Sequence, residues 1–416
     1  MYKENKLLNK LLDLGRKIIP KPVFKFAQPK YHWMLSMIGA IVYGFPSKSM
    51  AVIGVTGTKG KSTVVHMVSK ILEDQGQSVA AIGSLGFKIK DKTWPNTLKM
   101  TLPGRFKLQN FLSRAKRAGI EYVVLEATSE GIAQNRLVGI DLDCAVFTNL
   151  HREHLESHGS FENYMNAKRK LFAKTKGRHV LNIDDSNFEK FANYQARHKI
   201  TYGLEWGMLT PTNLRAKRED LNLKIIGDFN IRNALAALGV AYAYNLNMDE
   251  AVASLNAIES IPGRMEVFES KKDFKVIVDY AHTPDSLEAV YKNLKPDAKK
   301  LICVLGAAGG GRDKWKRPEF GKIASNYCDN IILTNEDPFD EDPNEILDQV
   351  ESGVADSAKH ERIVDRDEAI KKAISKAEAG DIVIITGKGS ETSIALRGGQ
   401  KKEWSDKNEV LKNLQD

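Results

Sequence analysis

Short apolar runs alternate with amphipathic helical runs along most of this chain. The first apolar run, Ala51–Val55, precedes a run at Ser62–Gln75 whose valines, isoleucine and leucine fall on one helical face. Repeated strand and helix alternation is typical of an α/β fold, in which helices cover both faces of a mostly parallel sheet. Further buried strands are predicted at Tyr122–Leu125, Ala145–Thr148 and Val180–Ile183.

A turn at Ile261-Pro262-Gly263 interrupts the alternation, and a second series of strands and helices follows it. At 416 residues the chain is long enough for two or three domains. We predict a short helical N-terminal segment at 1–48, a central α/β domain with the mostly parallel sheet at 49–262, and a C-terminal Rossmann-like α/β domain at 263–416. Strands of the last domain are expected at Lys275–Val278, Leu301–Leu305, Ile331–Thr334 and Ile382–Thr386.

A glycine-rich run joins the first strand to the first helix: Gly54-Val55-Thr56-Gly57-Thr58-Lys59-Gly60-Lys61-Ser62-Thr63. Glycines let backbone N–H groups turn toward a phosphate, and the helix N-terminus adds positive potential. A lysine supplies a point charge and a hydroxyl can ligate Mg²⁺. The run therefore predicts a nucleotide phosphate site, although Val55 stands where the usual spacing has its first glycine. Its candidate residues are Gly57, Thr58, Gly60, Lys61, Ser62 and Thr63.

Glu126 follows the strand Tyr122–Leu125, at a carboxyl end where open α/β sheets hold their ligands. Its carboxylate suits Mg²⁺, although a surface carboxylate at a strand end is an equally good interpretation. After the next strand, one short segment suits either a metal site or a solvated loop, because it contains His151, Glu153, His154, Glu156 and His158. Residue types alone do not decide which metal such a segment would hold.

Lys168 lies on a predicted helix at Phe161–Lys174. Nothing in the local sequence distinguishes it from Lys170 or Lys174. Long charged side chains on helices are exposed far more often than buried, so the sequence alone favours a solvated lysine at this position.

Charge and cysteine content narrow the partners and the compartment. Lys+Arg exceed Asp+Glu by 62 to 53, and the net charge of +9 is spread along the chain. Such a balance suits small anionic substrates or an acidic membrane surface, and without an aromatic-basic motif we expect no nucleic-acid partner. The odd number and wide spacing of Cys144, Cys303 and Cys328 predict buried thiols in a reducing compartment.

The N-terminal segment contains an apolar stretch, Tyr31–Phe45, that is shorter than the about 20 residues needed to span a bilayer. The simpler interpretation is an amphipathic helix packed on the next domain. The alternative is an interfacial membrane anchor, because the apolar face is flanked by Arg16, Lys17, Lys21, Lys25 and Lys30. We expect a cytoplasmic protein, with peripheral membrane contact through 1–48 as an open alternative.

Eight motifs occur between Ala51 and Glu391 in an order that one enzyme family shares: G-T-K-G-K-S, L-E-A-T-S-E-G-I-A-Q-N-R, F-T-N-L-H-R-E-H-L-E-S-H-G, Y-M-N-A-K-R-K-L-F, G-D-F-N-I-R-N-A-L-A-A, P-G-R-M-E-V, V-D-Y-A-H-T-P-D-S-L and G-K-G-S-E. The chain resembles the Mur ligases, and among them the UDP-N-acetylmuramoyl-L-alanyl-D-glutamate ligases. The resemblance implies a ligase that uses ATP and Mg²⁺ to activate a carboxylate as an acyl phosphate. Its substrates would be an amino acid and a muramoyl-peptide acceptor, in peptidoglycan precursor synthesis.

The resemblance also implies roles for residues in the matching motifs. Lys61 and Ser62 would hold the ATP phosphates and one Mg²⁺, and Glu126 and His154 would reach the metals. Lys168 would carry a carbamate whose oxygens help to place a second Mg²⁺. Both domains would contact the nucleotide and close over it, through Asn230, Asn233, Arg264 and Asp279. The acceptor and the amine would be held by Thr101, Thr128, Gln134, Arg136, Lys314, Asp337 and Glu391.

Several positions depart from the family pattern. Mur ligases usually begin with a domain that holds uridine diphosphate, whereas only a short segment precedes the phosphate loop here, so the acceptor would be held differently or would not be a free uridine diphosphate conjugate. Phe339 stands where diaminopimelate ligases carry the arginine of D-N-P-R, which clamps a carboxylate. Diaminopimelate is therefore disfavoured, and lysine or another amine is favoured. Three further residues also depart from the family pattern, and these departures indicate an altered choice of substrate: Glu130, Glu153 and Ser390.

Two other functions stay open. The short N-terminal segment also fits a folylpolyglutamate-synthase-like ligase, although the motifs P-G-R-M-E and D-Y-A-H-T-P-D speak against it. The alternative from another class is a nucleotide-binding partner subunit without ligase activity, held at a membrane by its N-terminal segment.

Overall fold

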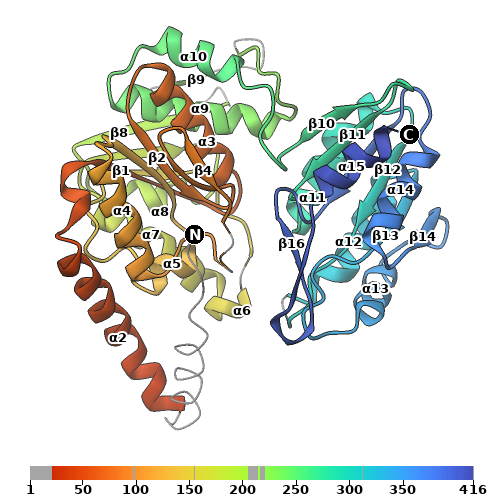
Figure 1. Ribbon diagram of the computed structural model, residues 1–416, viewed down its shortest axis with the longest axis horizontal. Helices are drawn as coiled ribbons and strands as arrows, with labels where there is room; N and C mark the ends of the chain where they lie inside the picture. Colours follow the sequence, from red (N-terminus) through yellow and green to blue (C-terminus); the bar gives the residue numbers. More distant parts are fainter. Residues whose placement is uncertain are drawn as a thin grey trace. The chain divides into compact units, whose positions relative to one another are not determined.

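The chain folds into two compact units, each built around its own sheet (Figure 1). The computed structural model describes residues 21–96, 98, 100–153, 155–204, 214–215, 221–311 and 313–415. The first unit takes its described residues from 1–150, 159–221 and 231–255, and the second from 151–158, 222–230 and 256–416. Both units are of the α/β class, which confirms the predicted fold class.

The first unit holds a nine-stranded sheet in the order β4-β3-β2-β5-β1-β6-β7-β8-β9. Strands β3 and β4 extend one edge in antiparallel fashion, and the other neighbours pair in parallel. The predicted apolar runs form the central strands, because burial on both faces of a parallel sheet selects nearly continuous hydrophobic sequence. The strands are β1 (Ala51–Thr56), β2 (Val79–Gly83), β3 (Gly86–Ile89), β4 (Lys92–Trp94), β5 (Tyr122–Glu126), β6 (Cys144–Phe147), β7 (Arg178–Asn182), β8 (His198–Gly203) and β9 (Leu214–Arg215).

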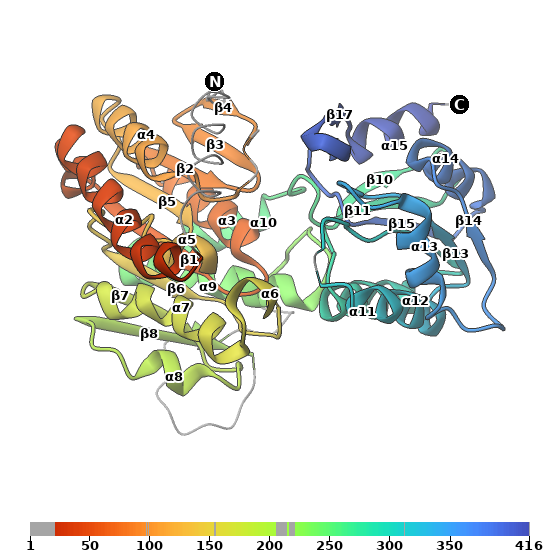
Figure 2. The same cartoon turned by 90° about the horizontal axis from the view of Figure 1, so that it is seen from below.

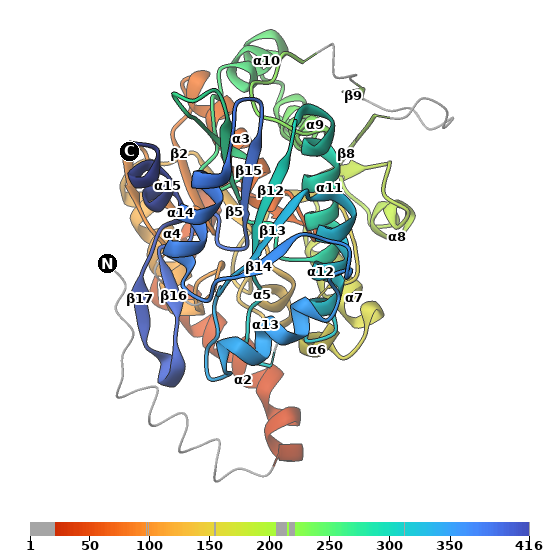
Figure 3. The same ribbon diagram turned by 90° about the vertical axis from the view of Figure 1, so that its right-hand side faces the viewer.

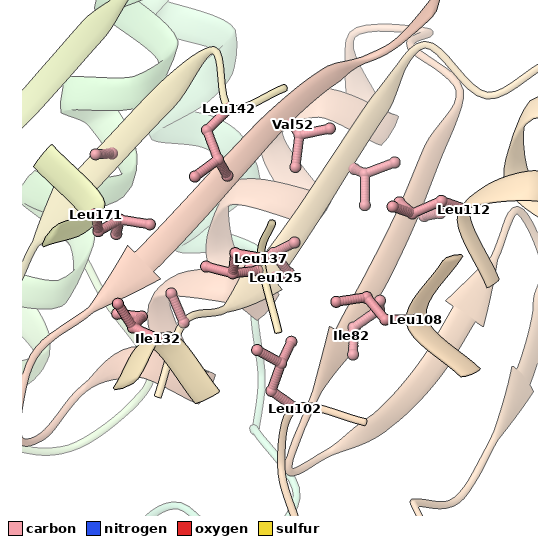
Figure 4. Close-up of a cluster of buried hydrophobic side chains, with 14 of the residues drawn as sticks. Val52, Ile82, Leu102, Leu108, Leu112, Leu125, Ile132, Leu137, Leu142 and Leu171 are labelled. Carbon is pink, nitrogen blue, oxygen red and sulfur yellow. The ribbon is translucent and has the colours of Figure 1, made fainter. Parts of the chain in front are cut away.

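Helices cover both faces of this sheet. They are α2 (Lys21–Val42), η1 (Pro46–Ser49), α3 (Lys61–Asp74), α4 (Arg105–Arg117), α5 (Ser129–Ala133), α7 (Phe161–Lys174), α8 (Phe188–Ala192), α9 (Asp228–Ala243) and α10 (Met248–Asn256). On one face, Leu108 of α4 and Leu171 of α7 join Val52 of β1 in one buried cluster (Figure 4). On the opposite face, Gly239 of α9 packs so closely that a Cβ there would lie 2.6 Å from a methyl carbon of Val180.

The second unit holds a six-stranded sheet in the order β10-β11-β15-β12-β13-β14, in which β10 runs antiparallel to β11 and the other neighbours are parallel. A separate hairpin pairs β16 with β17. The strands are β10 (Glu266–Glu269), β11 (Lys275–Asp279), β12 (Leu301–Leu305), β13 (Asn330–Leu333), β14 (His360–Arg362), β15 (Ile382–Thr386), β16 (Ser393–Ala395) and β17 (Lys401–Glu403).

The second unit contains the following helices. They are α6 (Leu155–His158), α11 (Pro284–Leu294), η3 (Lys295–Asp297), α12 (Lys316–Tyr327), α13 (Pro343–Glu351), α14 (Arg366–Lys376), η4 (Arg397–Gly399) and α15 (Asp406–Leu414). Figures 2 and 3 show α11 and α12 on one side of the sheet and α14 and α15 on the other. Leu287 and Phe320 belong to the buried cluster of the first side, and Ile370 and Val410 to that of the second.

Most predicted elements are confirmed. The helix predicted at Phe161–Lys174 is α7 residue for residue, and the strand at Ile382–Thr386 is β15. The short strands β3, β4 and β14 escape prediction, because three or four residues of mixed polarity give no period to detect. The N-terminal apolar stretch lies largely in α2, which contacts α4 as a packed helix should. Among the described residues, no helix is both long enough and apolar enough to cross a membrane.

The expectation of three buried thiols is wrong for two of the cysteines. Cys303, on β12, and Cys328, between α12 and β13, form a disulfide. Since β12 and β13 are neighbouring strands, the two Cα atoms lie 6.0 Å apart, a separation that a disulfide spans. Cys144 is buried and free, and burial raises the pKa of its thiol, with Asp143 adding to the effect.

Candidate functional site

The glycine-rich run forms a loop between β1 and the first turn of α3. Gly57 and Gly60 have positive φ, at 152° and 82°. A Cβ at Gly57 would lie 1.9 Å from Thr148 Oγ1, and one at Gly60 would lie 2.2 Å from the side-chain oxygen of Asn233. Lys61 folds back, and its ammonium donates to the Gly57 carbonyl oxygen at 2.9 Å. The loop therefore holds a cation at a helix N-terminus, an arrangement that suits phosphate.

Glu126 lies at the carboxyl end of β5 and is linked to the loop through Ser84. Its Oε1 accepts from the Ser84 N–H at 2.7 Å and from Ser84 Oγ at 3.0 Å. Ser84 Oγ also lies 2.6 Å from Ser62 Oγ, so a carboxylate and two hydroxyls gather beside the first turn of α3. Thr63, the other candidate hydroxyl, is buried. Because Glu126 is only 2% exposed, its interpretation as a surface carboxylate is wrong.

Lys168 also reaches the loop, and the expectation of a solvated lysine is wrong. Its side chain is buried, and its ammonium donates to the Gly57 carbonyl oxygen at 2.7 Å. The ammonium lies 4.6 Å from the centroid of the Tyr164 ring, whose hydroxyl is 3.0 Å from Thr58 Oγ1. Helix α7 turns this face toward the loop, whereas Lys170, two positions along, is exposed. The helical period distinguishes these two lysines once it is known which face of α7 packs against the rest of the unit.

Thr148 and Asn149, which directly follow β6, hold the loop from another side. Thr148 Oγ1 donates to the Lys59 carbonyl oxygen at 2.6 Å, and Asn149 Oδ1 accepts from the Lys59 N–H at 2.8 Å. The Asn149 carbonyl oxygen accepts from the Thr58 N–H at 2.9 Å. The local sequence does not mark either residue as one that holds the loop. Their signal is the one that singled out Glu126, a polar residue at the carboxyl end of a parallel strand.

The two asparagines of α9 lie in different surroundings. Asn233 is buried with its side-chain oxygen against Gly60, so it borders the phosphate loop. Asn230, in the first turn of the helix, groups with the second unit and donates from Nδ2 to the Ile226 carbonyl oxygen at 2.7 Å. Of these two asparagines, Asn233 is the one that lies beside the phosphate loop in the first unit.

Four residues that the family resemblance assigns to the acceptor gather around α5. Arg136 is buried; its Nη1 donates to the Leu102 carbonyl oxygen at 2.6 Å and its Nη2 to Gln134 Oε1 at 2.8 Å. Thr128 caps α5 with its side chain, and Thr101 directly precedes Leu102. Burial, and next the charge of a neighbouring arginine, lower the pKa of Arg136 to about 10. The guanidinium therefore stays cationic at neutral pH.

In the second unit, Arg264 and Asp279 lie close to Glu391. Asp279 Oδ2 accepts from the Met265 N–H at 2.8 Å. The Arg264 guanidinium lies over the Tyr280 ring, 4.4 Å from its centroid. The Tyr280 hydroxyl then donates to Glu391 Oε1 at 3.3 Å. One tyrosine thus connects the arginine proposed for the nucleotide with the carboxylate proposed for the amine.

Lys388, which sequence analysis does not single out, links Asp337 to Glu391. Its ammonium is fully buried and donates to Asp337 Oδ1 at 2.8 Å and to Glu391 Oε2. Burial works to lower the pKa of Lys388, but Glu391 and Asp337 outweigh it and hold the pKa above its ordinary value. The signal in the sequence is the motif G-K-G-S-E, in which this lysine precedes Glu391 by three positions.

Glu336 is a buried carboxyl beside this cluster. It is 5% exposed, and within the described part of the chain its Oε2 has no hydrogen-bond partner. Burial, and then the charge of Asp337, raise the pKa of Glu336 to about 7, against the opposing charges of Lys388 and Arg366. This carboxyl therefore changes charge near neutral pH.

The basic residues at the start of α12 divide into an exposed one in the preceding loop and a buried one in the first helical turn. Lys314 is exposed and lies 3.2 Å from Glu341 Oε2. Arg317 is fully buried and donates to Glu341 and to the side-chain oxygen of Gln349. Hydrogen bonds from Arg317 hold the pKa of Glu341 down to about 2. Arg317 therefore fixes the loop, and Lys314 is the residue of the two that solvent reaches.

His154 lies outside the described residues. Of its neighbours, His151 and Glu156 are exposed, and Glu153 is buried with Oε1 3.5 Å from His282 Nε2. Within the ranges that the structure describes, His, Cys, Asp and Glu side chains nowhere gather in threes as a metal-binding group.

Comparison with known proteins places both units in one group of enzymes. A family model of the Mur ligase middle domain matches residues 55–241, and one of the Mur ligase glutamate ligase domain matches residues 263–389. The chain is similar to the UDP-N-acetylmuramoyl-L-alanyl-D-glutamate–2,6-diaminopimelate ligase of Geobacillus kaustophilus (strain HTA426), with 36% identity over 385 residues that cover 86% of this chain and 78% of the relative.

Solved structures agree with this similarity. A structure of a UDP-N-acetylmuramoyl-L-alanyl-D-glutamate–2,6-diaminopimelate ligase has a TM-score of 0.60 and 31% identity, and covers 88% of this chain and 78% of that one. A folylpolyglutamate synthase from Mycobacterium tuberculosis, complexed with ADP, has a TM-score of 0.68 but 18% identity, over 86% of this chain and 92% of that one. The second likeness concerns the fold alone.

The raised pKa of Glu336 makes stability depend on pH. Its folded pKa of about 7 exceeds the ordinary 4.5, so its contribution is fully present below pH 4.5 and is lost as pH rises through 7. Glu336→Gln cannot ionise and so avoids this loss. Relative to the natural chain, its free energy of unfolding should rise by about 3 kcal/mol between pH 4.5 and pH 8. Denaturant unfolding at several pH values measures the difference. The exposed Glu345→Gln is the control, and equal pH slopes for the natural chain and Glu336→Gln would contradict the assignment.

Proposed function

The chain belongs to the Mur ligase family of ATP-dependent, ADP-forming amide ligases, and from this we propose that it joins an amino acid to a muramoyl-peptide carboxylate in peptidoglycan precursor synthesis. The acceptor carboxylate takes the γ-phosphoryl group of ATP, which leaves ADP and an acyl phosphate. The amine then attacks the acyl carbon, phosphate leaves, and the nitrogen gives up a proton as the amide forms.

The observation that carries this proposal is that Glu126 and Lys168, both distant in the sequence, converge on the loop that contains Lys61. Lys61 and Lys168 both donate to the Gly57 carbonyl oxygen, and Glu126 reaches Ser62 through a single serine. Phosphoryl transfer needs positioning and charge neutralisation more than covalent chemistry from the protein. The Lys61 ammonium and a carboxylate beside a helix N-terminus suit that task, and Lys168 brings a second nitrogen to the same carbonyl oxygen.

The oxygen donors at this loop fit a hard divalent cation. Mg²⁺ prefers carboxylate and hydroxyl oxygens, and Ser62 and Glu126 offer both within one hydrogen-bonded group. These two residues would hold the ion, which would neutralise charge on the ATP phosphates. His154 is proposed as a further ligand on the family resemblance alone.

Lys168 is proposed to carry a carbamate. A neutral amine adds CO₂ and loses one proton, which turns a cation into an anion with two oxygens. Its burial and its position at the phosphate loop favour such a group as a ligand for a second Mg²⁺.

For the nucleotide, Asn233 has the strongest support, because it borders Gly60. Asn230, Arg264 and Asp279 are proposed on the resemblance. For the acceptor, the cationic Arg136 orients Gln134, and the two lie with the candidate threonines around α5. An anionic muramoyl peptide suits a cationic side chain at this position.

For the amine, the second unit offers carboxylates in place of an arginine. Asp337 and Glu391 flank Lys388, and Phe339 stands where diaminopimelate ligases carry a guanidinium. An aromatic ring cannot pair with a carboxylate, so we propose an amino acid whose side chain ends in an ammonium, such as lysine. Folate is not favoured as the acceptor, because the likeness to folylpolyglutamate synthase is one of fold.

The reaction predicts a double requirement for ADP release. With ATP, Mg²⁺, a muramoyl-dipeptide nucleotide and a mixture of amino acids, ADP should appear only when acceptor and amine are both present, and mass spectrometry should find the amide product. Lys61→Ala should lower the rate by about a hundredfold or more, since it removes a charge at the transferred phosphate. Lys70→Ala, on the same helix but paired with Asp74 at the surface, is the matched control. Equal ADP release without acceptor or amine would overturn the proposed function.

The carbamate predicts a dependence on bicarbonate. After equilibration with ¹³C-bicarbonate, an NMR carbamate signal should appear in the natural chain and in Lys170→Ala, and should be missing from Lys168→Ala. Activity should fall when bicarbonate is stripped from the buffer and return when it is restored. A signal of the same intensity in Lys168→Ala would place the carbamate elsewhere.

The amine pocket predicts a preference among amino acids. The natural chain should use lysine with a kcat/KM at least about tenfold above that for diaminopimelate, because the latter brings a carboxylate to a pocket lined by carboxylates. Phe339→Arg should narrow or reverse this ratio, while Phe339→Leu should leave it unchanged. A natural chain that uses diaminopimelate as well as lysine would contradict the assignment.

A further inference from the structure

Helix α2 presents its small residues to the protein and its large apolar residues to solvent. Ser36, Gly39 and Ala40 are buried, and Ser36 Oγ donates to the Asn135 carbonyl oxygen at 2.7 Å. A surface helix of a globular protein normally does the reverse, with its large apolar residues against the core. The outward side chains, here called the α2 face, are 41 to 65% exposed and comprise Tyr31, Trp33, Met34, Ile38, Ile41 and Val42.

The α2 face is held in a fixed orientation. Arg105 of α4 donates from Nε to the His32 carbonyl oxygen at 3.1 Å and from Nη2 to the Gln134 carbonyl oxygen at 2.9 Å. Asn135 Nδ2 donates to the Pro29 carbonyl oxygen at 3.2 Å. These bonds attach α2 through its backbone, so its apolar side chains are left to face outward.

Exposed basic residues surround this face. The sequence has no acidic residue between Asp13 and Glu73 or between Asp91 and Glu121, and these two stretches contain α2 and α4. The two helices lie side by side (Figure 2). The exposed basic residues on and beside them are Lys30, Lys48, Arg114, Lys116 and Arg117, and Phe106 of α4 adds a further exposed ring.

This combination selects one kind of partner. A second copy bound through the same face would set basic residues against basic residues, because a two-fold interface is formed by one patch on both subunits. An anionic lipid surface supplies negative headgroups for the lysines and arginines and an acyl boundary for the apolar side chains. Since α2 falls short of a membrane span, it would lie in the plane of the interface.

We propose that the α2 face binds the surface of a membrane that contains anionic lipid. Trp33, Ile38 and Ile41 enter the boundary between headgroups and acyl chains, and the basic end of α4 lies over the phosphates. The binding is peripheral and needs neither nucleotide nor acceptor, so it stands apart from the ligase reaction.

Sedimentation of the full chain with lipid vesicles tests the proposal. The protein should bind vesicles of phosphatidylglycerol and phosphatidylcholine about tenfold or more tightly than vesicles of phosphatidylcholine alone, and added salt should weaken the binding. Trp33→Ser with Ile41→Ser should weaken it by about tenfold or more, because two buried apolar side chains are lost. Replacing Arg114, Lys116 and Arg117 with glutamine should weaken the binding and flatten its salt dependence.

Matched variants keep the test specific. Tyr242→Ser with Leu411→Ser removes two exposed apolar residues elsewhere, and Lys271→Gln with Lys371→Gln and Lys372→Gln removes three exposed charges elsewhere; both should bind as the natural chain does. Thermal unfolding should be unchanged in every variant, since all the positions are exposed. No preference for anionic vesicles, or undiminished binding by Trp33→Ser with Ile41→Ser, would overturn the proposal. The proposal would also be overturned if the natural chain did not bind vesicles but formed a dimer, and if Trp33→Ser with Ile41→Ser dissociated that dimer.

Discussion

The parallel register of β2, β5 and β1 is the constraint on which the proposed phosphate site depends. Val55 pairs with Glu126, so the phosphate loop and the carboxylate leave the sheet at the same edge. A Cβ at Gly83 would lie 2.3 Å from Glu126 Oε1, so β2 must end in glycine for the carboxylate to lie against it and accept from Ser84. A slip of one residue would turn Glu126 to the other face of the sheet and separate it from Ser84.

Buried lysines appear in both units, and each is stabilised differently. Lys168 donates to a neutral carbonyl and lies over a tyrosine ring, whereas Lys388 donates to two carboxylates. Taking an ammonium out of water costs several kcal/mol unless partners offset it, so each arrangement needs a reason beyond stability. The first lies at the site proposed for the phosphates, and the second lies at the site proposed for the amine. A ligase that joins a phosphorylated acid to an amine needs one of each.

Sequence reasoning reaches the elements and the glycine-rich loop because both are local. A strand, a turn and a helix N-terminus occupy consecutive positions, and their periods can be read directly. Ser84 and Asn149 escape because their partners lie 42 and 90 positions away, and the Asp337 partner of Lys388 lies 51 positions away. Lys168 differs from Lys170 only in which face of α7 meets the loop, and the pairing of Cys303 with Cys328 follows from the order of strands, which local sequence does not encode.

The amine pocket shows how two substitutions act together on charge. Against D-N-P-R, Asp337 replaces a neutral asparagine and Phe339 replaces a cationic arginine, so each shifts the local charge by −1 and together they shift it by −2. Lys388 offsets one carboxylate, and Asp337 and Glu391 are both within its reach. At about 5 Å and an effective dielectric near 20, one unit charge is worth about 3 kcal/mol, or about two orders of magnitude in affinity. A side chain that ends in an ammonium gains from this change, and one that ends in a carboxylate loses, so the pocket can reverse its preference while the phosphate loop stays as it is.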